Sequence, residues 1–169
     1  MRRKLIALMF CLAGAAHAAD APTPLNEDMA AFFSGHWTGA GAFGNGKKIE
    51  ADVDFQRELD SQMLLYRHTD KAPNSYKALG TWGVDKASGK LVMHVSDNFG
   101  GARRFESEGW MAGIVEFNKV GVPVAAGNRQ ERFTFWRKSP NSFRMNYEWS
   151  ADGAKWVLGD FIDFERKQP

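Results

Sequence analysis

The stretch FFSGHWTGAGAFGNGKK, Phe32 to Lys48, places five glycines around one tryptophan, Trp37. Gly39, Gly41 and Gly44 match the G-x-G-x-x-G pattern of dinucleotide-binding loops, which follow a strand and open a helix. In this chain the third glycine leads instead into a turn and an alternating apolar and polar segment, NGKKIEADVDF. The stretch therefore indicates a strongly bent β-hairpin and not a nucleotide-binding loop.

From Trp37 onward the chain shows no helical period, and about ten segments alternate apolar and polar residues between turn signals. The predicted strands are Trp37–Phe43, Lys48–Glu58, Met63–Asp70, Tyr76–Val84, Lys90–Ser96, Ala102–Trp110, Ile114–Asn118, Gln130–Lys138, Phe143–Ser150 and Lys155–Arg166. Short connections favour an antiparallel meander, and closure removes its exposed edges. We predict an all-β fold, a closed antiparallel up-and-down barrel of about ten strands.

The segment before the barrel divides into two parts. Residues 1–18 have a basic start, a short apolar run and small residues before a cut, which predicts a signal peptide cleaved before Ala19 and a periplasmic or secreted protein. A twin-arginine signal at Arg2-Arg3 is the alternative export route. Residues 19–34 form a Pro-rich lead-in and a short helix that Asn26 can cap, and residues 35–169 form the barrel domain.

Charge and cysteine content exclude several functions. The chain has 22 Lys+Arg against 20 Asp+Glu, but the predicted signal removes three basic residues, leaving 19 against 20. This balance does not indicate a nucleic-acid partner. The apolar run is too short to span a membrane. The single cysteine, Cys11, lies in the signal, so the mature chain has no disulfide and no cysteine-ligated metal.

Turn lengths predict register, and register decides which side chains face inward. A three-residue loop at Gly44–Gly46 predicts the pairs Trp37–Val53, Gly39–Ala51 and Gly41–Ile49. A tight turn at Asp60-Ser61 predicts Phe55–Tyr66 and Val53–His68. In the next hairpin the apolar set is Tyr76, Trp82 and Val84 opposite Leu91, Met93 and Val95. For the later hairpin, hydrophobicity alone sets Phe133 and Phe135 opposite Met145 and Tyr147. A two-residue Asp152-Gly153 loop predicts Trp149–Trp156, Tyr147–Leu158, Met145–Asp160 and Phe143–Ile162. Trp37 would then plug one end, and the inward Gly39 and Gly41 would leave space above it.

These features resemble a known superfamily, the calycins. A short helix followed by Gly35-His36-Trp37 resembles the lipocalin signature, and GHWTGAG is similar to the opening of nitrobindin-like haem-binding barrels. YKALGTWGVD and DNFGGARRF resemble small exported lipocalin-like bacterial proteins of uncharacterised function. The resemblance implies that Trp37 packs against Arg166 as the barrel floor. Nitrobindin-like barrels carry an axial haem histidine near the C-terminus, whereas the last histidine here is His94, so we expect no haem.

Three polar residues are candidates, each with a structural alternative. His68 would hydrogen-bond a ligand or hold a metal, or be a satisfied core histidine. Asp160 would anchor a ligand or act as a general acid or base, or be satisfied by Tyr147 or an arginine. Arg103 would receive a carboxylate ligand, or form cross-strand ion pairs at the surface.

The expected function is binding of a small apolar or amphipathic molecule inside the barrel, with no cofactor and no metal. The candidate cavity residues are Phe55, Tyr66, His68, Tyr76, Trp82, Met93, Arg103, Phe105, Phe133, Phe135, Met145, Tyr147 and Asp160. One alternative is a filled, non-catalytic envelope or interaction protein with an apolar patch on the loop VGVPVAAG, residues 120–127. A second is an enzyme that uses Asp160 or His68, and a third is haem binding without the histidine.

Overall fold

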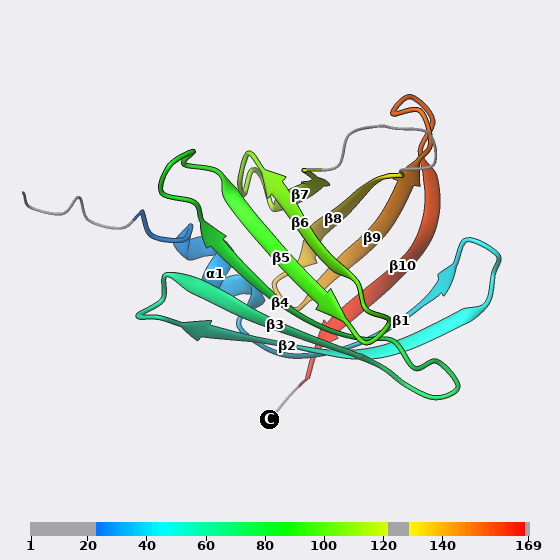
Figure 1. Cartoon of the computed structure of the whole chain (residues 1–169). Coiled ribbons are helices and arrows are strands. Elements are labelled where there is room, and N and C mark those ends of the chain that lie inside the picture. The colour runs from blue at the N-terminus through cyan, green and yellow to red at the C-terminus, as the bar shows by residue number, and fades with distance from the viewer. Residues whose placement is uncertain (1–22, 122–128, 168–169) are drawn as a thin grey trace, which may run out of the picture.

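The computed structural model describes residues 23–121 and 129–167. Within them, one short helix, α1 (Glu27–Phe33), precedes ten strands that close into one antiparallel barrel (Figure 1). The strands are β1 (Gly35–Phe43), β2 (Lys48–Glu58), β3 (Met63–Asp70), β4 (Lys77–Val84), β5 (Leu91–Asp97), β6 (Ala102–Ser107), β7 (Ile114–Lys119), β8 (Gln130–Ser139), β9 (Ser142–Ser150) and β10 (Val157–Arg166). Each strand pairs with its neighbours in sequence, and β10 pairs with β1. The predicted closed all-β barrel is confirmed.

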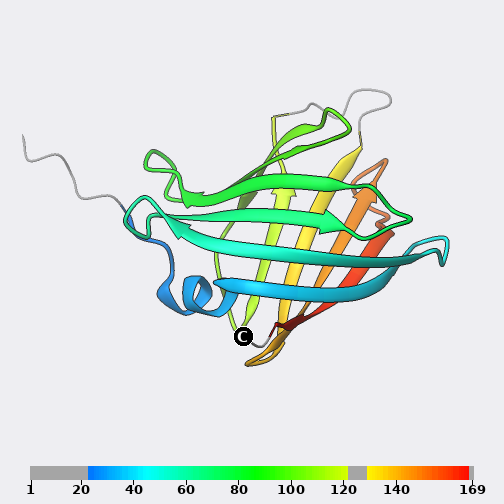
Figure 2. The ribbon, with the colours of Figure 1, turned by 90° about the horizontal axis from the view of Figure 1, so that it is seen from below.

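The barrel has two walls and one covered end. Strands β1 to β4 run across strands β7 to β10 when the molecule is seen from below (Figure 2). Helix α1 lies at one end, on the left in Figure 1, and the β1–β2 turn lies at the other. Among the described residues, no helix is long and apolar enough to cross a membrane. The predicted signal peptide, residues 1–18, lies outside the described residues.

The helix begins and ends where the sequence indicates. The side-chain Oδ1 of Asn26 accepts a hydrogen bond from the backbone N–H of Met29 at 3.0 Å, which caps the first turn. The chain turns into β1 at Gly35, whose φ of +114° suits a residue without a Cβ. Helix α1 thereby turns its apolar face, with Met29 and Phe33, into the barrel end.

Trp37 and Arg166 form the floor beneath α1. The indole Nε1 of Trp37 donates a hydrogen bond to the carbonyl oxygen of Phe33 at 2.7 Å. The Cζ atom of Arg166 lies 4.1 Å from the centre of the Trp37 ring. The Arg166 guanidinium also donates to the carbonyl oxygens of Ser34 at 2.7 Å and Phe32 at 2.5 Å. These contacts join the first strand, the last strand and the helix end.

The half of the barrel next to α1 is filled with aromatic side chains. The fully buried aromatic residues are Phe33, Trp37, Phe55, Trp82, Phe105, Phe117, Phe143 and Phe164. The ring of Phe33 lies 5.1 Å from that of Trp82 and 5.3 Å from that of Phe143, both nearly edge-on. Edge-to-face packing at this separation is favourable for aromatic rings.

Most of the predicted registers are confirmed. Trp37 pairs with Val53, Gly41 with Ile49, and Phe55 with Tyr66. Gly46 has a φ of +84°, which allows the three-residue loop between β1 and β2. The remaining confirmed pairs are Gly39–Ala51, Val53–His68, Trp82–Met93, Val84–Leu91, Phe133–Tyr147 and Phe135–Met145.

The predicted β9–β10 register is wrong. Tyr147 pairs with Asp160 and Met145 with Ile162, not Tyr147 with Leu158 and Met145 with Asp160. The further pairs observed are Trp149–Val157 and Phe143–Phe164, in place of Trp149–Trp156 and Phe143–Ile162.

The loop chemistry at Asp152 explains the difference. Its carboxylate accepts hydrogen bonds from the backbone N–H groups of Ala154 at 2.8 Å and Lys155 at 2.9 Å, which lengthens the loop beyond two residues. A β-bulge between Leu158 and Asp160 then shifts the pairing by one further residue. Because the two shifts together amount to an even number of residues, Asp160 still faces inward.

Gly39 allows side chains of β10 to pack closely against β1 and leaves no free space inside the barrel. A Cβ on Gly39 would lie 2.5 Å from Cδ1 of Phe164 and 2.6 Å from Cγ2 of Ile162, so these side chains already occupy the volume above it. The expectation of free space at this position is wrong. The interior beside Gly39 is filled from β10.

Gly41 is predicted to be necessary for barrel closure. A Cβ at this position would lie 1.8 Å from the carbonyl oxygen of Phe161, a backbone atom that cannot rotate away. Gly41→Ala should therefore destabilise the protein by about 2 kcal/mol, as overpacking does, in urea unfolding. In the control Gly83→Ala the nearest atom would be Cε of Met63 at 3.5 Å, so we expect a change below about 0.5 kcal/mol. Equal effects of the two substitutions would contradict this account of closure.

Candidate functional site

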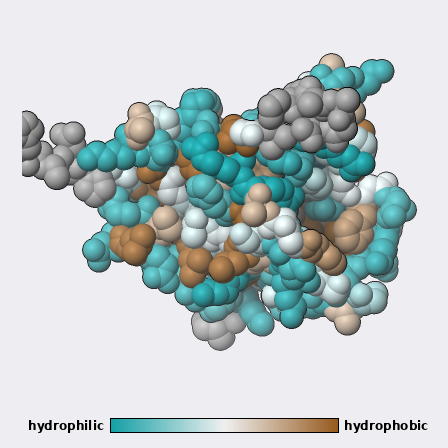
Figure 3. Space-filling view, in the orientation of Figure 1, coloured by the Kyte–Doolittle hydropathy of each residue, from teal (hydrophilic) through white to brown (hydrophobic). Residues whose placement is uncertain are grey.

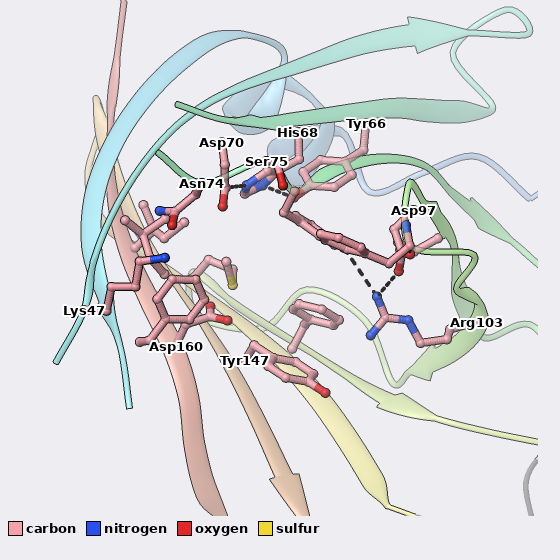
Figure 4. Close-up of a pocket in the computed structure, with 18 of the residues that line it drawn as sticks. Lys47, Tyr66, His68, Asp70, Asn74, Ser75, Asp97, Arg103, Tyr147 and Asp160 are labelled. Carbon is pink, nitrogen blue, oxygen red and sulfur yellow. Dashed lines mark hydrogen bonds and ion pairs between the residues drawn. The ribbon is translucent and has the colours of Figure 1, made fainter. Parts of the chain in front are cut away.

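A cavity of about 470 Å³ occupies the half of the barrel away from α1. Its apolar surface comes mainly from both walls of the barrel: Ile49, Met93, Val95, Phe133, Phe135, Met145 and Ile162. At its mouth the β3–β4 loop contributes Pro73, Asn74 and Ser75. The ring of Phe99, which is 71% exposed, stacks on Tyr76 with ring centres 6.2 Å apart. The polar side chains converge on this space from opposite walls (Figure 4).

Ten of the thirteen predicted cavity residues line this space. They are Tyr66, His68, Tyr76, Met93, Arg103, Phe133, Phe135, Met145, Tyr147 and Asp160. The prediction for Phe55, Trp82 and Phe105 is wrong, since none of the three lines the cavity and their rings pack in the filled aromatic part of the barrel. Alternation along a strand predicts correctly that these three side chains point inward. It does not predict where along the barrel axis the packed core ends and the cavity begins.

A buried hydrogen-bonded series runs along β3. The Tyr66 hydroxyl lies 2.8 Å from Nδ1 of His68, and Nε2 of His68 lies 2.7 Å from Oδ1 of Asp70. The i, i+2 spacing places all three side chains on one face of the strand. Because a carboxylate only accepts, Nε2 of His68 donates to Asp70. Both ring nitrogens are thus engaged, which fits the satisfied core histidine and leaves neither nitrogen free for a metal.

Arg103 faces inward but is already paired. Its Nη2 lies 3.0 Å from Oδ2 of Asp97 and its Nη1 2.9 Å from Oε2 of Glu131. Lys119 holds the other Glu131 oxygen at 2.5 Å. Burial would raise the pKa of Glu131, but hydrogen bonds from Lys119 and Arg103 outweigh burial and leave this pKa lowered. Arg103 therefore lines the cavity and forms its ion pairs there, and not at the surface as the second alternative expected.

Asp160 differs from these residues because its carboxyl group has no hydrogen-bond or ion-pair partner among the described residues. It lies on β10 beside Tyr147, on the wall opposite the β3 series (Figure 4). Burial, with a smaller contribution from the negative charge of Asp70, raises the pKa of Asp160 to about 7. Neither Tyr147 nor an arginine satisfies it, contrary to the structural alternative. The carboxyl group therefore titrates near neutral pH and faces the cavity.

Several lining residues were not predicted. Phe43, Ile49 and Asp70 continue inward-facing alternations that the confirmed registers imply, so the sequence carried a signal for them. Asp97 likewise follows Met93 and Val95 on the inward face of β5. Lys47 lies in the β1–β2 turn, where alternation gives no direction. No group of three metal-ligating side chains occurs in the part of the chain that the structure describes.

Comparison with known proteins identifies no family. No family model matches the chain, and no curated protein matches it. Among solved structures, a de novo designed fluorescence-activating β-barrel is 15% identical, with 83% of this chain and 98% of that chain covered and a TM-score of 0.45. EF1p2_mFAP2b bound to DFHBI is 13% identical, with 82% and 96% covered and a TM-score of 0.44. A DUF3598-family protein of unknown function from Nostoc punctiforme is 8% identical, with 81% and 97% covered and a TM-score of 0.28. These likenesses are too distant to carry a function.

Proposed function

We propose that this chain is an exported calycin-like barrel that binds a small apolar or amphipathic molecule in its interior. The observation that carries the proposal is the cavity of about 470 Å³, which lies within the usual range of ligand sites, roughly 300 to 1,000 Å³. Export rests on the signal peptide predicted from the sequence, with cleavage before Ala19.

The lining suits a molecule with an apolar body and a polar end. Side chains such as Met93, Val95 and Phe135 supply an apolar surface, and burial of ligand area against them is the main source of affinity. Asp160 supplies a carboxyl group at one end of the same space (Figure 4). Such a lining, mostly apolar with a few placed polar groups, orients a ligand as well as holding it.

The filled, surface-acting barrel fits the structure less well, because that alternative requires an interior without a cavity. Exposed hydrophobic residues occur at different elements: Leu59, Leu79, Phe99, Met111, Ile114, Val157 and Leu158. On the face shown in Figure 3 the surface is largely hydrophilic, with hydrophobic residues in small groups. Of the loop proposed as a patch, residues 122–127 lie outside the described residues.

One observation favours a second candidate function, acid–base chemistry by Asp160. Its pKa of about 7 matches what a general acid or base needs near neutral pH. His68, the other catalytic candidate, has both ring nitrogens engaged by Tyr66 and Asp70. An enzyme predicts that a bound molecule is recovered chemically changed after incubation, and that Asp160→Asn stops the change.

The test of the proposed function is native mass spectrometry of the mature protein purified from the envelope fraction, with an absorption spectrum of the same sample. Binding predicts a reproducible extra mass that is lost on denaturation, and the mature mass shows whether cleavage precedes Ala19. A band near the haem region would instead support haem. An apo mass after incubation with a broad set of small amphipathic molecules would contradict the proposal.

A further inference from the structure

The charges around Arg103 are balanced without a ligand. Arg103 and Lys119 face two carboxylates, Asp97 and Glu131, at separations of 3.0 Å or less. Asp97 is held in place as well, since its Oδ1 accepts hydrogen bonds from the backbone N–H groups of Phe99 at 3.0 Å and Gly101 at 2.8 Å. An anionic ligand arriving here would have to displace an existing ion pair, so this side of the cavity is a poor anion site.

At the end of the cavity away from Arg103, where Asp70 and Asp160 lie on facing walls, the charges are not balanced (Figure 4). Asp70 is held by one hydrogen bond from His68, and Asp160 has no partner among the described residues. The lysine that lines the cavity is Lys47, which is exposed on the β1–β2 turn. Its Nζ lies 5.8 Å from the centre of the Phe43 ring, and no ion pair between it and Asp160 occurs among the described residues. The field at this end of the cavity is therefore set by carboxyl groups.

Resting on the proposed function, we propose that the ligand carries a basic nitrogen, an ammonium group that pairs with the Asp160 carboxylate while its apolar body lies against Met93 and Phe135. Asp160 is partly buried. A carboxylate that is partly removed from water and has no partner is destabilising, and a cation in hydrogen-bonding contact offsets that cost. The aromatic rings of Tyr147 and Phe133 line the same space and attract cations through their faces. An acidic ligand would instead meet two carboxyl groups of like charge.

The test compares three probes with one chain length: octylamine, octan-1-ol and octanoate. Calorimetric titration at pH 8 keeps octylamine protonated and Asp160 mainly ionised. We expect octylamine to bind about tenfold or more tightly than octan-1-ol, which is the usual size of a hydrogen bond to a charged group, and octanoate to bind weakest. Asp160→Asn should reduce octylamine binding to the level of octan-1-ol and leave octan-1-ol unchanged. The matched control is Asp163→Asn, on the same strand, whose carboxylate pairs with the exposed Arg144 and should affect no probe.

The pH profile supplies a second readout. As the pH falls below about 7, Asp160 takes up a proton, and octylamine affinity should decline toward that of octan-1-ol. Other titratable or charged groups face the same space from the surrounding elements: Lys47, Tyr66, His68, Asp70, Tyr76, Asp97, Arg103 and Tyr147. The pH profile of octylamine affinity in Asp160→Asn measures the contribution of these groups. The difference between the wild-type profile and the Asp160→Asn profile is the contribution of Asp160.

The outcomes separate the two claims. If octan-1-ol binds and octylamine binds no more tightly, the amine inference is overturned while cavity binding stands. Tightest binding of octanoate likewise overturns it and points to an acidic ligand. If none of the three probes binds at millimolar concentration, both the amine inference and the proposed function are overturned.

Discussion

Trp37→Ala is expected to destabilise the protein by about 4 kcal/mol, within the range for removing a large buried aromatic side chain. Trp37 is fully buried, donates a hydrogen bond to the carbonyl oxygen of Phe33 and carries the Arg166 guanidinium 4.1 Å above its ring. Its removal leaves a cavity at the junction of the first strand, the last strand and α1. Denaturant unfolding followed by circular dichroism measures the change.

A matched pair of substitutions separates the effect of losing the Trp37 hydrogen bond from the effect of losing side-chain volume. Trp37→Phe loses the bond to Phe33, whereas the Nε1 of Trp82 has no partner among the described residues, so Trp82→Phe removes an unsatisfied donor. We expect Trp37→Phe to cost about 1 kcal/mol more than Trp82→Phe. A change below about 1 kcal/mol in Trp37→Ala would contradict the role of Trp37 as the barrel floor.

Asp160→Asn is expected to stabilise the unliganded protein at pH 8, by about 2 to 4 kcal/mol. The pKa of Asp160 rises from 3.8 to about 7 in the fold, and such a rise corresponds to about 4 kcal/mol if fully expressed. Because the pKa of Asp160 is higher in the folded protein, folding favours the protonated carboxyl group. The free energy of unfolding of the wild type is therefore highest below pH 3.8 and falls as the pH rises through about 7. The amide carries no charge and avoids this loss.

The measurement is the free energy of unfolding of both proteins between pH 4 and pH 8. The advantage of Asp160→Asn should be largest above pH 7 and should shrink as the pH falls toward 4. Asp163→Asn is the control with the opposite sign. A hydrogen bond from Arg144 lowers the pKa of Asp163, so this substitution should be slightly destabilising at neutral pH. A pH-independent difference between wild type and Asp160→Asn would show that the carboxyl group is not buried as described.

The fold could be predicted from the sequence wherever local chemistry set the register. Gly46 closes the β1–β2 loop in the left-handed region, and the apolar residues of β1 and β2 then coincide in one register only. The β9–β10 loop could not be predicted from its Asp-Gly pair, because Asp152 uses its side chain to extend the turn. The bulge between Leu158 and Asp160 leaves no turn signal in the sequence.

The sequence predicts which side chains of the candidate site point into the barrel. It does not predict how far along the barrel the packed core extends, or which polar groups pair with one another. Alternation placed Tyr66, His68 and Asp160 inside, since side chains change face at every residue of a strand. It could not show that Phe164 and Ile162 fill the space above Gly39. These contacts join β1 and β10, which are far apart in the sequence and become neighbours only when the barrel closes.

Methyl NMR of methionine-labelled protein during titration with octan-1-ol tests interior binding most directly. Met93 and Met145 line the cavity, whereas Met29 is buried in α1 and Met111 is 66% exposed. The account predicts that the Met93 and Met145 signals shift together and saturate, while the Met29 and Met111 signals stay in place. Unmoved Met93 and Met145 signals, or a shift at Met111 alone, would contradict a ligand-binding interior.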